Sequence, residues 1–322
     1  MDHFRRLGNS IAIPIPADEN ALTGRECPQP DCEGYFKVEF GTGLKGEALP
    51  CHCPYCGHTT GHDHFWTKEQ IEYAKSIAMR RITDAIHKDL KKLEFDHKPK
   101  GAFGLGISMK VKPGRPTPIH YYRERQLETE VVCVNCTLRY SVYGVFAFCP
   151  DCGQHNSLQI LDKNLEVVGK MLDLAAQTEK ELSEKLVENA LEDCVSAFDG
   201  FGRELCRIRA NRARNPARVE KLSFQNLEGA RSSLLDAFGI DLSAAVEPDE
   251  WRAAGAGFQK RHLVAHKTGV VDQDYITKTG DTHAVVGRKI GIGADEVRQL
   301  ARIINKLAQR LSDDFQELGT SP

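Results

Sequence analysis

One arginine and two histidines fall within six residues in the segment RHLVAH, at Arg261, His262 and His266. A histidine can donate or accept a proton near neutral pH. An arginine can bind a phosphate through two N–H groups and neutralise negative charge that develops on it. His262 and His266 are four residues apart, so they share one face if the segment is helical. Together these side chains have the parts that RNA cleavage requires.

Two other interpretations of this segment stay open. Two histidines at this spacing can bind a metal, but Leu263 stands where the H-E-x-x-H motif has its glutamate, and the next acid is Asp272. Cationic side chains near the C-terminus of a helix are also favourable in themselves, because they lie at the negative end of the helix dipole. By the same argument, the helix end should favour protonated imidazoles.

Eight of the eleven cysteines form two sets of four that predict metal sites. The first set is Cys27, Cys32, Cys53 and Cys56, and the second is Cys133, Cys136, Cys149 and Cys152. Each pair can place two thiolates on one tight turn, and two such turns make a tetrahedral Zn–S₄ site. Both sets resemble zinc ribbons, which implies two structural Zn²⁺ ions. The alternatives are reduced thiols in a small β-domain or an iron–sulfur cluster.

The ligands of the second set are better defined than those of the first. Both halves of the second set are spaced C-x2-C, whereas the first set begins with C-x4-C. Cys51, His52 and His58 lie close enough in the sequence to compete as ligands of the first metal. Closed tetrathiolate sites are usually structural, so we expect neither metal to be catalytic.

Composition indicates an ordinary globular protein. The chain has 322 residues and a net charge of −2, so no general excess of basic residues indicates nucleic-acid binding. The N-terminal segment has no apolar stretch of signal-peptide type, and no run of apolar residues is long enough to span a membrane. We therefore expect a cytoplasmic protein without a membrane partner.

Helical periodicity and helix-end signals predict which helices carry the motifs. Thr67 is a plausible N-cap of one helix across 67–95, between the two cysteine sets. After about residue 161, five amphipathic helices are expected, near 163–189, 190–213, 222–238, 248–267 and 294–315. The RHLVAH segment then ends the fourth of these helices, with Gly269 just beyond it.

The expected fold is therefore multidomain, with two small β zinc ribbons joined by a helix and followed by an all-α bundle. The expected parts are zinc ribbon 1 (1–66), a connecting helix (67–97), a basic loop with zinc ribbon 2 (98–160), and the helical bundle (161–322).

The helical part resembles the HEPN family, and in particular its RiboL-PSP-like branch. The resemblance lies in the R-x4-H spacing of Arg261 and His266, late in a helical bundle, and in the wider stretch FQKRHLVAHKTGVVDQDYI. It covers roughly 161–322. The resemblance implies a metal-independent endoribonuclease that works as a homodimer, with two motifs facing one cleft.

The same resemblance implies roles for individual residues. Arg261 would hold the scissile phosphate, and His266 would act as general base or acid while the ribose 2′-OH attacks that phosphate. The products would be a 2′,3′-cyclic phosphate and a 5′-OH. His262 would orient the substrate or the catalytic histidine. Asp199, a polar residue between Phe198 and Phe201, is a further candidate.

Two locally basic stretches are candidates for binding nucleic acid. Residues 98–125 contain seven Lys or Arg with Tyr121 and Tyr122, and residues 203–221 contain another seven. Candidate RNA-binding residues are Arg203, Arg207 and Lys267. The alternative for both stretches is ordinary solvated surface.

The sequence thus predicts an RNA-cleaving protein of toxin, stress or antiviral-defence type, with ribbons that bind nucleic acid or a protein partner. The rival hypotheses are a non-catalytic zinc-ribbon binding or scaffold protein, and a metal-dependent hydrolase at His262 and His266.

Overall fold

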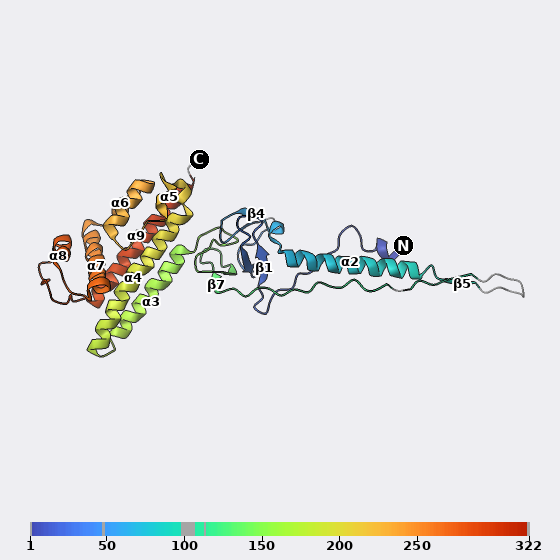
Figure 1. Ribbon diagram of the computed structural model, residues 1–322, viewed down its shortest axis with the longest axis horizontal. Coiled ribbons are helices and arrows are strands. Elements are labelled where there is room, and N and C mark those ends of the chain that lie inside the picture. The colour runs from blue at the N-terminus through green and yellow to red at the C-terminus, as the bar shows by residue number, and fades with distance from the viewer. Residues whose placement is uncertain (1, 47–48, 98–106, 113, 321–322) are drawn as a thin grey trace, which may run out of the picture. The chain divides into compact units, whose positions relative to one another are not determined.

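The chain forms two compact units, Met1–Gln154 and His155–Pro322 (Figure 1). The computed structural model describes residues 2–46, 49–97, 107–112 and 114–320. Within these residues the strands all belong to the first unit, and the second unit is largely helical. This confirms the predicted order of two cysteine-bearing β-hairpin regions followed by a helical part. None of the helices described is long and apolar enough to cross a membrane.

The first unit is built on one antiparallel sheet that both cysteine sets share. β1 (Thr23–Glu26) and β2 (Tyr35–Val38) form a hairpin around the first cysteine pair. β7 (Thr129–Val132) and β8 (Arg139–Val142) form the equivalent hairpin around the third pair. β2 also pairs with β8, which gives the strand order β1-β2-β8-β7. The two predicted ribbons are therefore halves of one sheet.

An approximate two-fold relation extends to the turns that carry the second and fourth cysteine pairs. The His52 N–H donates to the Pro150 carbonyl at 2.7 Å, and the Phe148 N–H donates to the Pro54 carbonyl at 2.8 Å. Each bond joins the residue before the first cysteine of one turn to the proline after the first cysteine of the other. The two halves thus hold each other through the sheet and through these turns.

A short hairpin carries the second cysteine pair in its turn and leads to the long helix. β3 (Pro50–His52) pairs with β4 (Thr59–Gly61), and the 3₁₀ helix η1 (His62–Phe65) follows. The Phe65 ring is fully buried and packs edge-on against Phe36, with ring centroids 5.8 Å apart. This contact closes the core of the first half.

The connecting helix α2 (Lys68–Lys91) begins at the predicted N-cap. The Gln70 N–H donates to the Thr67 hydroxyl at 3.1 Å, and the Thr67 N–H donates to the Gln70 side-chain carbonyl at 3.2 Å. This reciprocal capping box satisfies two donors of the first turn. The Gln70 amide also donates to the Gly24 carbonyl at 2.9 Å, which fastens the start of the helix to β1.

Two extended segments cover α2 along its length (Figure 1). The N-terminal helix α1 (Asp2–Arg5) is attached where the His3 and Phe4 N–H groups each donate to the Asp89 carboxylate at 3.0 Å. At the far end, β5 (Phe95–His97) pairs with β6 (Ile107–Met109), and the chain then returns beside the helix.

The second unit is a helical bundle in which α4 contacts α3, α7 and α9. Its long helices are α3 (Ser157–Ala175), α4 (Lys180–Ile208), α6 (Leu227–Phe238), α7 (Pro248–Lys267) and α9 (Ala294–Thr320). Its short helices are η2 (Ala210–Arg212), α5 (Pro216–Val219), η3 (Leu242–Ala245) and α8 (Gln273–Thr279).

Aromatic side chains fill the centre of this bundle. The Phe198 ring of α4 packs edge-on against Phe224 and Phe258, at centroid distances of 5.5 and 6.2 Å. A Cβ on Gly202 would lie 2.6 Å from the Phe224 ring, so a glycine is required there for the loop before α6 to approach α4. The loop is thereby held next to Asp199.

Helix α7 has the predicted bounds, because its end signals are strong. Pro248 lies in the first turn, and the Glu247 and Glu250 side chains form a capping box. The helix ends at Lys267, its C-cap Thr268 lies in the left-handed region with φ of 52°, and Gly269 follows with φ of 79°. Beyond it, the described residues include α8, which the sequence analysis did not predict because a seven-residue helix carries little periodicity.

Several predicted helix boundaries were wrong. The helix expected to run to residue 95 ends at Lys91, and the one expected to run to 213 ends at Ile208. The break between the first two helices lies at residues 176–179 rather than near 189, since the apolar stripe continues unbroken through the second helix. The first helix also begins earlier, at Ser157. The helix predicted from 222 begins at Leu227, because the Asn226 side chain accepts from the Gly229 N–H and caps it.

A buried ion cluster joins the start of the second unit to α4. The Glu204 carboxylate accepts two bonds from the Arg207 guanidinium, both at 2.7 Å, and lies 3.3 Å from His155 Nε2. Burial alone would raise the pKa of Glu204, but the bonds from Arg207 and His155 outweigh it and lower the pKa to about 2. The charged form of Glu204 therefore stabilises the fold.

Replacing Glu204 should test this contribution. A pKa below the usual value of 4.5 means that the stabilisation is present above pH 4.5 and is lost as pH falls toward 2. We expect Glu204→Gln to lower the free energy of unfolding by about 2–3 kcal/mol near pH 7. The difference from wild type should shrink below pH 4.5, as measured by urea unfolding followed by circular dichroism. The exposed Glu184→Gln is the control, and an equal loss in both variants would contradict the assignment.

Candidate functional site

The structure brings each predicted cysteine set together in space. In the first set, Cys27 Sγ lies 3.7 Å from Cys56 Sγ, and Cys32 Sγ lies 3.7 Å from Cys53 Sγ. In the second set the corresponding pairs are 3.6 Å apart, between Cys133 and Cys152, and 3.5 Å apart, between Cys136 and Cys149. Within each set all four sulfur atoms lie within 4.8 Å of one another.

These distances are compatible with two zinc sites. Tetrahedral zinc with four thiolates at about 2.3 Å places its sulfur atoms about 3.8 Å apart. A disulfide would need about 2.05 Å, and all eleven cysteines are free. Burial raises the pKa of Cys27 to about 11 and that of Cys136 to about 12, so a bound cation is needed to hold these groups as thiolates near neutral pH.

The alternative ligands of the first site lie outside the four-sulfur group. Cys51 is buried in β3. His52 Nδ1 is 2.8 Å from the Thr59 hydroxyl, and His58 Nδ1 is 3.0 Å from the Gln29 amide. The irregular C-x4-C spacing is thus accommodated without a substitute ligand.

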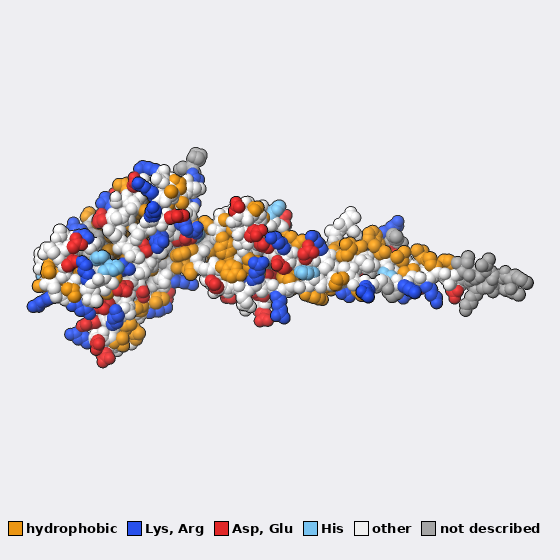
Figure 2. All heavy atoms as spheres, viewed as in Figure 1, with side chains coloured by type: hydrophobic (Ala, Val, Ile, Leu, Met, Phe, Trp, Pro, Cys, Tyr) orange, Lys and Arg blue, Asp and Glu red, His pale blue; other side chains and the backbone are white. Residues whose placement is uncertain are grey.

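The second candidate site is the exposed C-terminal end of α7. His262 and His266 are both exposed, with ring centroids 4.9 Å apart, as their spacing predicted. Figure 2 shows histidine side chains at the surface over this helix with basic side chains beside them. The helix end is anchored by Leu263, which is buried against Val271 and Tyr275.

Arg261 is held by a chain of polar contacts that reaches into the bundle. Its guanidinium donates from Nη1 to the Gln225 side-chain carbonyl at 3.3 Å, and the Gln225 amide donates to the Asp199 carboxylate at 3.3 Å. Asp199 is 6% exposed and also accepts from the Phe224 N–H at 2.5 Å. The Nε of Arg261 is buried, and no acceptor for it lies among the described residues.

The electrostatics of His262 differ from the expected effect of a helix end. Partial burial, followed by the neighbouring His266, Lys267, Lys278 and Arg261, lowers the pKa of His262 below its usual value. The cations around His262 and its burial outweigh the negative end of α7, so the neutral imidazole is favoured. Lys278 belongs to α8, which supplies one side of the site.

The candidate RNA-binding residues have ion-pair partners. Lys267 pairs with Asp272, whose carboxylate also caps α8. Arg203 lies 3.9 Å from Asp199 and so borders the chain of contacts that holds Arg261. Arg207 is bound to Glu204 in the ion cluster described above. Arg203 thus joins the site through Asp199, whereas the structure links Arg207 to a stabilising contact.

Sequence reasoning missed the contributions of Gln225 and Lys278. Gln225 lies in a loop, and its contact with Arg261 depends on the packing of Gly202 and Phe224, which brings that loop to α4.

In the basic stretch 98–125, residues 98–106 and 113 lie outside the described part of the chain. The Tyr121 side chain of this stretch is 77% exposed, and its ring lies beside that of Tyr73, with centroids 6.3 Å apart.

Comparison of the sequence with protein-family models and curated proteins, and of the structure with solved structures, gave no match.

Zinc content can be tested with a matched pair of cysteine variants. Cys136→Ser removes one ligand of the second site, and we expect bound zinc to fall from two equivalents to about one or fewer, because the two halves share a sheet. Thermal stability should fall with it. Cys51→Ser should retain two equivalents, as measured by elemental analysis of dialysed protein. Loss of zinc from Cys51→Ser would restore Cys51 as a ligand.

Proposed function

We propose that the chain is an endoribonuclease of the HEPN type, which cleaves RNA through the end of α7 without a catalytic metal. The observation that carries the proposal is the grouping of Arg261, His262 and His266 on one exposed helix end, with the two imidazoles 4.9 Å apart. Two proton-transfer groups beside a phosphate-binding guanidinium are the parts that RNA cleavage requires.

In this mechanism Arg261 binds the scissile phosphate with the donors that its protein contacts leave free. His266 accepts the proton of the ribose 2′-OH while that oxygen attacks phosphorus. The bond from phosphorus to the 5′ oxygen breaks, and the leaving oxygen takes a proton from a histidine that acts as the acid. The products are a 2′,3′-cyclic phosphate and a 5′-OH. DNA lacks the attacking hydroxyl and is not cleaved by this route.

His262 orients the substrate or His266. Its lowered pKa keeps the ring neutral at pH 7, so it can accept one hydrogen bond and donate another. The chain Asp199–Gln225–Arg261 supports the same proposal, because a guanidinium held at one end loses less conformational freedom on binding phosphate.

The proposal extends to the partners. RNA is the substrate, and two copies of the helical unit form a homodimer that brings two Arg–His sets to one cleft. The zinc ions are structural, and the physiological setting is toxin, stress or antiviral-defence activity. Within the described residues, the groups of three or more possible metal ligands are the two cysteine sets, so His262 and His266 have no third ligand close by. This favours metal-independent chemistry over a hydrolase with a metal at these histidines.

Cleavage of RNA by the wild type and His266→Ala is the first test. We expect wild type to cleave total tRNA or a structured mRNA in EDTA and to leave cyclic phosphate ends. His266→Ala should be at least about 100-fold slower, because general acid–base catalysis contributes on this scale. Arg261→Lys should also be impaired, since lysine cannot bind phosphate through two fixed N–H groups.

The control for this test is Lys185→Ala on α4, which should cleave like wild type. Equal cleavage by wild type and His266→Ala would place the chemistry elsewhere. RNA binding without cleavage would favour the non-catalytic binding protein, and cleavage abolished by EDTA while both structural zinc ions remain bound would favour the metal-dependent hydrolase.

The pH dependence of RNA cleavage should follow the charges that surround His262. His262 must be neutral to accept a hydrogen bond, and its pKa is lowered, so the acid limb of kcat/KM that comes from protonating His262 should lie below pH 6.5. Lys278→Met removes one of the cations that lower this pKa and should move the limb upward. NMR titration of the His262 ring measures the same shift directly. An unchanged titration in Lys278→Met would contradict the assigned cause.

A further inference from the structure

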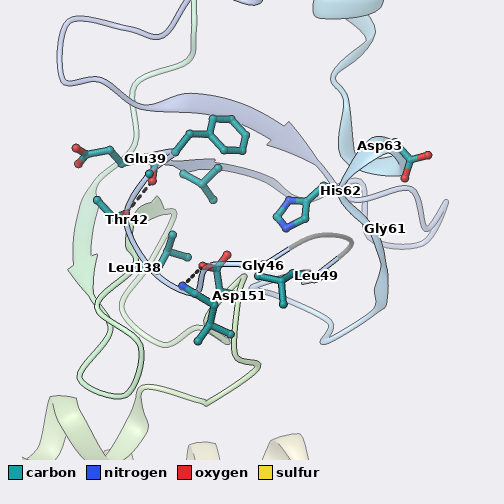
Figure 3. Close-up of a pocket in the computed structure, with 13 residues that line it drawn as sticks. Glu39, Thr42, Gly46, Leu49, Gly61, His62, Asp63, Leu138 and Asp151 are labelled. Atoms are coloured by element: carbon teal, nitrogen blue, oxygen red, sulfur yellow. Dashed lines mark hydrogen bonds between the residues drawn. The ribbon is translucent and has the colours of Figure 1, made fainter.

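The first unit contains a cavity of about 470 Å³ that the proposed function does not use (Figure 3). It opens between the end of β2, the loop that follows it, the start of η1 and the turn of the fourth cysteine pair. Its size falls within the range of roughly 300–1,000 Å³ typical of pockets that hold small ligands.

The walls of the cavity are mostly apolar. The apolar side chains that line it are Val38, Phe40, Leu44, Leu49 and Leu138. Phe40 is 54% exposed, yet its ring is fixed from behind. The buried Arg25 guanidinium lies 4.7 Å from the centroid of the Phe40 ring and 4.1 Å from that of Trp66, so it is stacked between them. The aromatic wall is thus preformed.

Two polar side chains point into this apolar space, His62 and Asp151 (Figure 3). Asp151 is only 9% exposed and accepts one bond, at 3.0 Å from the Leu44 N–H. Within the described residues, no Lys or Arg forms an ion pair with it, although buried carboxylates are usually paired. The Nδ1 atom of His62 is buried and has no hydrogen-bond partner in the same part of the chain.

The charges around the cavity select the kind of ligand. Among the residues that the structure describes, the lining includes three carboxylates, of Glu39, Asp63 and Asp151, and no Lys or Arg. Glu39 turns away toward Arg139, with which it forms an ion pair at 2.6 Å, and Asp63 also points out of the cavity. A phosphate or a nucleotide would find no cation here, whereas a cationic group would find an unpaired carboxylate.

We propose that this cavity binds a lysine or arginine side chain presented by a polypeptide partner. The methylene groups of such a side chain contact the walls formed by Phe40 and Leu138, and the charged head reaches Asp151. A neutral His62 imidazole can accept a further N–H bond at Nδ1. The site is independent of the end of α7 and makes the cysteine-bearing unit a protein-recognition module.

The proposal can be tested with matched peptides on the zinc-loaded full chain. The probes are acetylated Gly-Gly-Arg-Gly-Gly and Gly-Gly-Lys-Gly-Gly, with a citrulline peptide that keeps the shape of arginine without its charge. Binding is followed by NMR shifts and by calorimetry. We expect saturable binding of the arginine or lysine peptide and at least about tenfold weaker binding of the citrulline peptide.

Two variants locate the binding. Asp151→Asn keeps an oxygen for the Leu44 N–H but removes the charge, and it should abolish the preference for arginine over citrulline. Glu39→Gln, whose carboxylate points away, should bind like wild type. If Asp151→Asn does not retain two zinc equivalents, His62→Leu takes its place and should weaken binding several-fold.

Several results would overturn the proposal. Equal binding of arginine and citrulline peptides would remove the role of charge. Saturable binding of adenosine or cytidine, with none of the peptides, would make the cavity a nucleobase site instead. An absence of saturable binding by any of these probes would leave the cavity without the assigned ligand.

Discussion

The first unit depends on the two sets of four thiolates. Each strand of its central sheet is only four residues long, and so short a sheet buries too little apolar surface to be stable by itself. Metal coordination by the cysteine turns would supply what the strands lack, because a bound metal adds folding free energy directly. Pairing of β2 with β8 and the exchange of bonds between the His52 and Phe148 turns then couple the two sites. The capping box that starts α2 is fastened to this sheet through Gln70, so the long helix depends on it as well.

The stability of the helical unit has a different source. Its helices bury continuous apolar stripes, and its stability comes from packing around α4. Two buried carboxylates fix the local structure. Glu204 fixes the start of the unit, whereas Asp199 holds the loop that positions Arg261. The exposed end of α7 is therefore attached to the rigid interior through polar contacts, which is how a surface cluster can keep a defined geometry.

Much of the fold and of the two candidate sites was predictable from local sequence signals. The eight thiolates were identified from spacing alone, since a cysteine pair on a turn has few other uses in such a chain. Thr67 and Pro248 marked helix starts correctly because their capping chemistry is local. The pairing of β2 with β8 was not predictable, because it joins strands about a hundred residues apart. Gln225 and Lys278 were missed for the same reason, as their place near Arg261 and His262 depends on tertiary packing around Gly202 and on the short helix α8. The reduced pKa of His262 likewise depends on neighbours that the sequence does not place.

The two-fold relation in the first unit is approximate, and a large departure from it lies between the cysteine pairs. Twenty residues separate Cys32 from Cys53, whereas twelve separate Cys136 from Cys149. The longer spacer contains the loop with Phe40, Leu44 and Leu49, which forms the cavity wall. The two halves of the near-symmetric pair thus differ by eight residues of spacer, and the cavity belongs to the half with the longer one. The shorter spacer shows that twelve residues are enough to join two cysteine turns of one set, so the eight further residues are not needed to bring the sulfur atoms together.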